Sequence, residues 1–180
     1  MTQIDADEME QVFYHQTIDK STGEQVWWVG SKKLHGYDNE WLQFLDTPVL
    51  NLETAQKPVL EFEACWSLEA LDGKHEGYDG SDGWNIQISG QNGNDFKVLM
   101  PDLEPYNAAS LYSFGETFAL GYGIPGYGGR SDGWKRIRVN LENVKSSQNI
   151  FRFAFASNSS YCSRDDAELT GLFIDNIRVT

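Results

Sequence analysis

The amino-acid sequence predicts an all-β fold, a two-sheet antiparallel β-sandwich of the jelly-roll kind. Apolar residues recur at every second position in several segments, glycine is frequent (17 of 180 residues), and no segment shows the periodicity of an amphipathic helix. The chain is 40% hydrophobic and 13% aromatic, so it can bury a core, and its length suits one domain. We expect residues 25–180 to form a single domain and residues 1–24 an N-terminal arm or edge strand.

The strands follow from the alternation. The clearest is PVLEFEACWSL at residues 58–68, where apolar side chains at even positions alternate with Glu61, Glu63, Cys65 and Ser67. One face of such a strand is buried and the other is wetter. Similar patterns, and short apolar runs bounded by turn residues, predict the further strands 25–30, 41–45, 47–52, 84–89, 96–100, 137–141, 151–156 and 171–179.

Two connections stand out. Residues 90–94 (GQNGN) predict a turn that joins two strands into a hairpin. Residues 101–129 are long, rich in Gly and Tyr, and lack clear periodicity, and a run of that kind within a compact domain is usually functional. An exposed aromatic ring can stack on a sugar. The candidates for such a platform are Tyr106, Tyr112, Tyr122 and Tyr127, followed by Trp134.

Two similar segments, GYDGSDGW at 77–84 and GYGGRSDGW at 126–134, both end in Ser-Asp-Gly-Trp at the entrance to an expected strand. The repeat is too short for a duplicated domain. It predicts two equivalent corners of one architecture.

The formal net charge is −13, which argues against nucleic acid and anionic membranes as partners because phosphate binding depends on basic patches. No apolar run approaches the roughly 18 residues of a membrane span. Excess carboxylates fit either solubility or a site for a hard cation such as calcium.

Enzyme signatures are weak. The sequence has no HExxH pattern, no GxSxG elbow and no phosphate-binding loop. Glu61 and Glu63 share a strand face and could form a glycosidase carboxylate pair, but a solvated face explains them better. We therefore expect no enzyme.

Asp175 is the most informative carboxylate. Strict alternation in GLFIDNIRV points it the same way as Phe173, Ile177 and Val179, and an unpaired buried carboxylate costs several kcal/mol. Two explanations remain open: a β-bulge that re-aims Asp175, or a cation that satisfies it. Further oxygen ligands for such a cation could come from Asp38, Asn39, Glu10 or Glu63.

The chain has two cysteines, Cys65 and Cys162, too few for a disulfide scaffold or a zinc site. They form either one bridge across the fold or two unrelated thiols. The bridge is the prediction to be tested.

Several segments, taken in order, resemble one superfamily: LDTPVLNL, PVLEFEACW, DGWNIQIS, GGRSDGWKRIRVNL, FRFAFASN and GLFIDNIRV. This set is similar to the MAM-like jelly-roll domains, above all to the domain that follows the catalytic unit in immune inhibitor A-type metalloproteases, and to the cleaved-adhesin domains of gingipains. The resemblance covers about residues 25–180. The long segment 101–129 departs from it.

The resemblance implies a two-sheet jelly roll within a secreted or cell-surface multidomain protein. It also implies a structural calcium held by Asp175 and Asp38, with Asn39 less firmly. We expect a monomeric, non-catalytic binding or adhesion module for carbohydrate or a cell-surface protein. The alternatives are a purely structural accessory domain and, third, a jelly-roll glycosidase or lyase.

Overall fold

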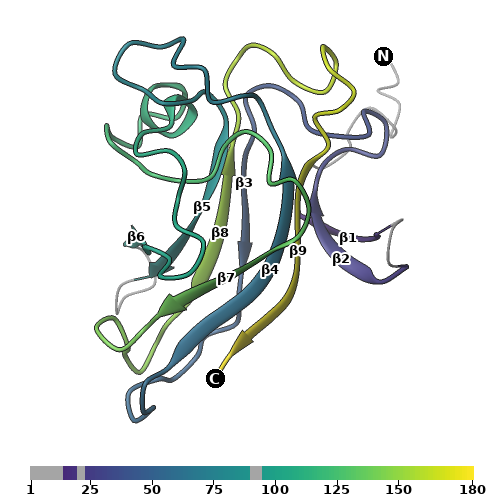
Figure 1. Ribbon diagram of the computed structural model, residues 1–180. Coiled ribbons are helices and arrows are strands. Elements are labelled where there is room, and N and C mark those ends of the chain that lie inside the picture. Colours follow the sequence, from purple (N-terminus) through teal and green to yellow (C-terminus); the bar gives the residue numbers. More distant parts are fainter. Residues whose placement is uncertain (1–13, 20–22, 90–94) are drawn as a thin grey trace, which may run out of the picture.

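The computed structural model describes residues 14–19, 23–89 and 95–180, and these residues form two antiparallel sheets (Figure 1). One sheet has five strands in the order β1-β2-β9-β4-β7 and the other has four in the order β3-β8-β5-β6. The fold is therefore the two-sheet β-sandwich that the sequence predicts. The strands are β1 His15–Ile18, β2 Gln25–Val29, β3 Leu42–Asp46, β4 Val59–Ser67, β5 Gly83–Ser89, β6 Phe96–Val98, β7 Lys135–Asn140, β8 Phe151–Ala156 and β9 Gly171–Val179.

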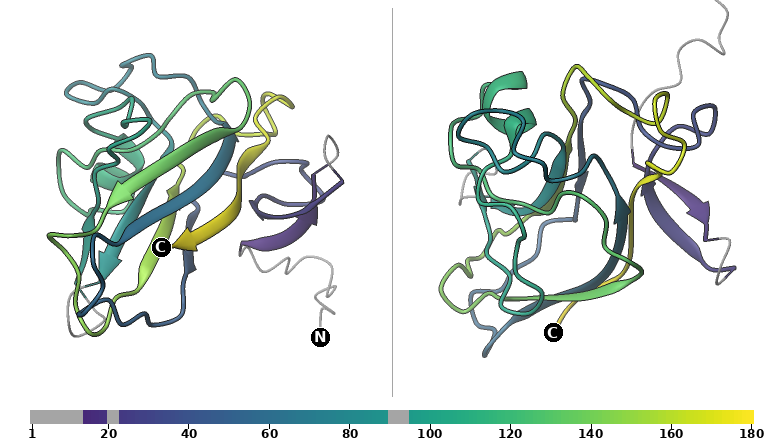
Figure 2. Two further views of the ribbon diagram at one scale, coloured as in Figure 1. Left: turned by 60° about the horizontal axis from the view of Figure 1, so that its bottom comes forward. Right: turned by 45° about the horizontal axis from the view of Figure 1, so that its top comes forward.

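Each predicted strand except one has a counterpart in the structure, and the predicted alternation holds except after a bulge in β9. Residues 47–52 form no strand and make only an isolated bridge, between Leu50 and Asn149. The predicted hairpin joins β5 to β6, although its turn, 90–94, lies outside the described residues. β1 is an edge strand of the five-stranded sheet, and Figure 2 shows the β1–β2 hairpin at one side of the sandwich.

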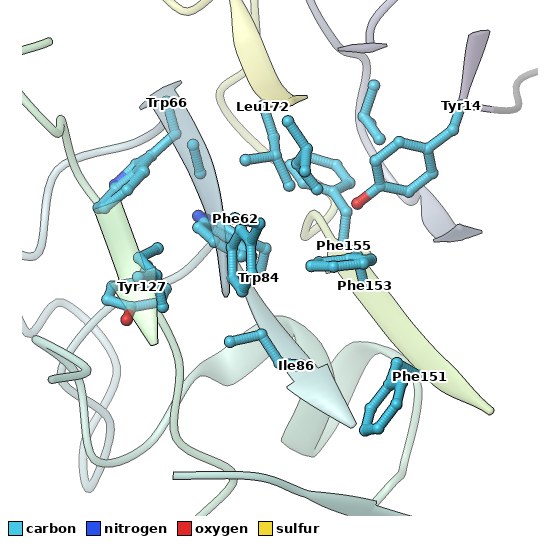
Figure 3. Close-up of a cluster of buried hydrophobic side chains, with 14 of the residues drawn as sticks. Tyr14, Phe62, Trp66, Trp84, Ile86, Tyr127, Phe151, Phe153, Phe155 and Leu172 are labelled. Carbon is cyan, nitrogen blue, oxygen red and sulfur yellow. The ribbon is translucent and has the colours of Figure 1, made fainter. Parts of the chain in front are cut away.

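The core fills the space between the sheets with aromatic rings (Figure 3). β4 contributes Phe62 and Trp66, and β5 contributes Trp84. The three rings meet edge to face, with centroids 6.3 Å apart for Phe62 and Trp84 and 5.3 Å apart for Trp66 and Trp84. β8 adds three phenylalanines from alternate positions, Phe151, Phe153 and Phe155, each fully buried. Such pairs add about 0.5–1.5 kcal/mol each beyond area burial.

A bulge in β9 separates Asp175 from the apolar residues that follow it. The register of β9 against β4 shifts between Glu61 and Glu63, and Asn176 adopts a left-handed conformation with φ of 53°. The extra residue reverses the alternation, so Ile174 and Ile177 both face the core. Asp175 instead pairs across the sheet with Glu63. A bulge is one of the two explanations that the sequence left open, and the structure contains it at this place.

Part of the long segment 101–129 forms a second small core. It packs on the outward face of the four-stranded sheet, where Ala154 and Ala156 are small enough for Leu111 and Phe114 to approach. Part of it, Ser113–Thr117, is a short π-helix, η2, which lies beside the upper end of β5 in Figure 1. The segment lacks periodicity because its apolar residues cover a sheet rather than extend one.

The two cysteines are free thiols, so the predicted bridge is wrong. Cys65 is half-buried on the outward face of β4, and its neighbour at 3.6 Å is the Ser131 hydroxyl. Cys162 is buried in the loop before β9, 3.4 Å from Asp38 Oδ1. The spacing of two cysteines in the sequence does not show whether the fold brings their thiols close enough for a bridge.

Candidate functional site

A groove of about 640 Å³ lies on the outward face of the five-stranded sheet. Its size falls within the range typical of small-molecule sites. Three aromatic side chains line it, namely Trp28, Trp134 and Phe173. Its polar lining includes Asp19, Lys32, His35, Thr17 and Thr170.

Strand register explains why the aromatic residues gather there. Trp28 stands opposite His15 on one side and Phe173 on the other, and Phe173 stands opposite Cys65. Residues that pair across antiparallel strands share a face, so these four side chains form one row across β1, β2, β9 and β4. Trp28 and Phe173 are stacked, with ring centroids 5.7 Å apart and planes 6° apart. The rings of Trp28 and Phe173 form the apolar floor of the groove.

Two glycines make room for Trp28. A Cβ on Gly30 would lie 2.0 Å from the Trp28 ring, so only glycine lets the indole lie over the chain. Gly171 has φ of 90°, and a Cβ there would lie 2.2 Å from the carbonyl oxygen of Val29. The indole Nε1–H donates to the carbonyl oxygen of Thr170 at 2.8 Å. The floor is thus fixed by backbone contacts on both sides.

Trp134 closes the groove from the side of β7, which is the edge strand opposite β1. It precedes β7, and its indole Nε1–H donates to Asp19 Oδ2 at 3.0 Å, at the end of β1. Figure 1 shows the start of β7 passing over β9 toward the β1–β2 hairpin. Trp134 and Phe173 are both half-buried, so each keeps surface for a ligand.

Beyond the aromatic row, the same face carries paired charges. Glu61 accepts hydrogen bonds from Arg136 at 2.8 Å and from Arg178 at 2.9 Å. Desolvation alone would raise the pKa of Glu61, but these two arginines lower it. Glu63 accepts a bond from the side chain of Asn176 at 2.7 Å. The solvated-face interpretation of Glu61 and Glu63 agrees with this network.

The predicted metal ligands lie in different environments. Asp38 is held by Arg164, at 2.5 Å from its Nη2, and this pairing lowers the pKa of Asp38 to about 2. Asn39 donates its backbone N–H to the same carboxylate, while its side-chain oxygen is buried and has no hydrogen-bond partner among the described residues. Asp175 lies opposite Glu63 on the outward face.

Among residues 14–19, 23–89 and 95–180, no three His, Cys, Asp or Glu side chains are grouped to hold a metal ion. Glu10, the remaining predicted ligand, lies outside the described residues. These side chains by themselves do not fit a calcium site, and calcium binding stays a prediction.

The five predicted platform residues divide into three groups. Trp134 lines the groove. Tyr127 is 1% exposed in the core, and Tyr106 packs against it, so the predicted role for Tyr127 does not suit its position. Tyr112 stacks on His75 with centroids 3.7 Å apart, and Tyr122 is 73% exposed. The reason is that Tyr106 and Tyr127 pack into the main core between the sheets rather than facing solvent.

The two Ser-Asp-Gly-Trp segments are used differently, contrary to the predicted equivalence. In the first, Asp82 and Trp84 are both fully buried. In the second, Asp132 is exposed with φ of 53°, and Trp134 lines the groove. The motif places a tryptophan at a strand entrance, and the sheet that the strand joins decides its environment.

Sequence reasoning missed Trp28 and Phe173 as site residues. The sequence did contain a signal for both. Val29 and Ile174, the residues that follow them, fit the core, so by strand alternation Trp28 and Phe173 point to the outward face. An aromatic residue on a predicted outward face is the feature that would have revealed the groove.

Fold and groove together define a β-sandwich protein with an aromatic-lined cavity on one sheet face. No family model matches the chain, and no curated protein matches it. Among solved structures, one that matches is a glycoside hydrolase family 43 arabinoxylan arabinofuranohydrolase from Bacillus subtilis in complex with cellotetraose. The identity is 8%, the TM-score is 0.39, and the match covers 88% of this chain but 21% of that one. Within the described part of the chain, no helix has the length and apolar character to cross a membrane.

Proposed function

We propose that this chain is a non-catalytic carbohydrate-binding module whose site is the groove on the five-stranded sheet. The observation that carries the proposal is the combination of Trp134 and Phe173, half-buried across a cavity of about 640 Å³. Aromatic faces bind the apolar face of a sugar ring, and a few polar groups at the rim fix its orientation. Asp19, Lys32 and His35 are polar residues that line the same cavity.

The resemblance to MAM-like domains supports a place for the module in a secreted or cell-surface chain. In that setting the module would attach a larger protein to a glycan. The second candidate, a structural accessory domain, is favoured by the extensive outward-face pairing around Glu61, which is typical of a solvated surface.

A glycan-array screen, run with calcium and again with a chelator, tests the proposal. Glycans that bind should then be measured by titration calorimetry against Trp134→Ala. Loss of one stacking partner should weaken binding about two- to tenfold, because aromatic contacts of this kind contribute about 0.5–1.5 kcal/mol.

Tyr122→Ala is the matched control. Tyr122 is the most exposed aromatic side chain among the described residues and lies outside the groove, so its loss should leave affinity unchanged. Equal affinities for wild type and Trp134→Ala would place binding elsewhere. Release of new reducing ends from a bound glycan would show that the module is catalytic.

A further inference from the structure

A second cavity, of about 410 Å³, lies at the end of the sandwich where β4 ends. We call it the end pocket. Its floor is apolar and comes from Leu68, Leu71 and Leu169. Its rim is polar and aromatic, formed by Asn107, Arg130, Asp166 and Tyr161. An apolar floor beneath convergent polar groups is the usual composition of a small-molecule site.

Tyr161 is the exposed aromatic residue of the end pocket. Its side chain is 44% exposed, and the Lys74 ammonium lies 5.5 Å from its ring centroid. The backbone of Tyr161 has φ of 69°, an uncommon conformation for a bulky residue. Strained residues of this type cluster at ligand sites.

Arg130 is held in place by two carboxylates. Its Nη1 lies 2.6 Å from Glu168 and its Nη2 lies 3.3 Å from Asp166. These bonds engage two of the five N–H groups of the guanidinium, and the side chain is 45% exposed, so it can also donate to a ligand. The flanking carboxylates offset its charge. The pocket therefore favours a neutral ligand rich in hydroxyl groups over an acidic one.

Another part of the end pocket is preorganised by a side chain that pairs with the backbone. Asn107 donates to the carbonyl oxygen of Gly128 and accepts from its N–H, both at 3.0 Å. A Cβ on Gly128 would lie 2.5 Å from the side chain of Leu71, so glycine keeps this part of the floor open. A wall fixed in advance reduces the entropy cost of binding.

The end pocket adjoins the groove. Three segments each supply one residue to the groove and one to the end pocket. The groove receives Cys65, Trp134 and Thr170, and the end pocket receives Leu68, Arg130 and Leu169 from the same three segments, which are β4 and its end, the segment before β7 and the entrance to β9. Ser67 lies between the two cavities, bridged to Arg130 and bonded to the carbonyl oxygen of Glu168. The two cavities are therefore consecutive along one surface of the molecule.

We propose that the end pocket is a second sugar subsite, so that the module binds a neutral oligosaccharide with one part in the groove and another against Tyr161 and Arg130. The inference rests on the proposed function, since it extends the same site. It predicts that affinity increases with chain length until both cavities are filled.

The test measures affinity by titration calorimetry for three homologous series from two to six units: β-1,4-linked glucose, β-1,4-linked xylose and β-1,3-linked glucose. In at least one series, affinity should rise about tenfold or more between dimer and hexamer. Tyr161→Ala and Arg130→Gln should remove that rise and leave the dimer affinity unchanged. Trp134→Ala should weaken the binding of dimer and hexamer to the same extent, whereas Tyr122→Ala should weaken neither.

Thermal melts of each variant show whether the fold is kept, and Tyr161→Phe, which retains the ring, should behave as wild type. Binding that is independent of chain length, or a hexamer affinity that Tyr161→Ala and Arg130→Gln leave intact, overturns the second subsite and leaves the groove standing. Absence of binding throughout all three series overturns both proposals.

Discussion

Asp82 provides the sharpest test of the packing at the end of the sandwich, because it is a carboxylate with no exposed surface. It accepts a hydrogen bond from the Tyr37 hydroxyl at 2.8 Å and from the backbone N–H of Asn158 at 2.7 Å. Glu69 and Lys74 are the charged side chains that influence it. Desolvation dominates over the two hydrogen bonds and raises the pKa of Asp82 to about 7, against an ordinary value of 3.8.

The sign of the pH effect follows from that difference. Between pH 3.8 and about 7 the folded chain holds a proton on Asp82 that the unfolded chain has lost. The contribution of Asp82 to stability is therefore fully present below the lower pKa and disappears as the pH rises through the higher one. From pH 5 to pH 8 this amounts to about 3 kcal/mol, at up to about 1.4 kcal/mol per pH unit.

Urea denaturation of wild type and Asp82→Asn at several pH values measures the effect. Asparagine does not titrate, so the difference in free energy of unfolding between the two proteins should change by about 3 kcal/mol from pH 5 to pH 8. Asp102→Asn is the control, because Asp102 is a surface partner of Arg138. Parallel pH profiles for wild type and Asp82→Asn would refute the assignment of a buried, protonated carboxyl.

Three further results are expected. Gly171→Ala should lower the free energy of unfolding by more than about 2 kcal/mol, because its Cβ would lie 2.2 Å from a carbonyl oxygen of β2, whereas Gly133→Ala, with φ of 104° and open space, should cost about 1 kcal/mol in a urea melt. Similar losses for the two would contradict the packing argument. Alkylation of denatured, unreduced protein should add two groups by intact mass, at Cys65 and Cys162, and an unmodified mass would indicate a bridge. If calcium is bound, a chelator should lower the melting temperature and calcium should restore it, and Asp175→Asn should reduce both changes. The prediction is contradicted if neither addition changes the melting temperature of protein that elemental analysis shows to be free of calcium.

The strands could be predicted because each carries its own period-2 pattern. β4 and β8 are the clearest cases: their alternating Phe62, Trp66, Phe153 and Phe155 face the space between the sheets as the sequence indicates. β9 is where the pattern misleads. Asn176 takes a left-handed conformation, and the side chains after it point to the opposite face from the one that alternation predicts. Asparagine is only one of several residues that adopt this conformation, so the sequence does not mark the position.

The site was only partly predictable because it depends on register between strands far apart in the sequence. Trp134 could be proposed from its own segment. The stack of Trp28 on Phe173 could not, since it requires that β2 pair with β9 across more than half of the chain. The tyrosines of 101–129 were misleading for a related reason: a segment without periodicity can cover a sheet as well as bind a ligand.

The position of β9 has a consequence for how the protein is made. β9 lies between β2 and β4, which are synthesised long before it. Until residue 179 has left the ribosome, both earlier strands keep an edge of unpaired backbone groups, and such edges are templates for aggregation. Contacts of such high sequence separation also form slowly. A nascent chain of this protein is therefore exposed to misassembly until its synthesis passes β9, and it should depend on chaperones at that stage more than a fold with local pairing does.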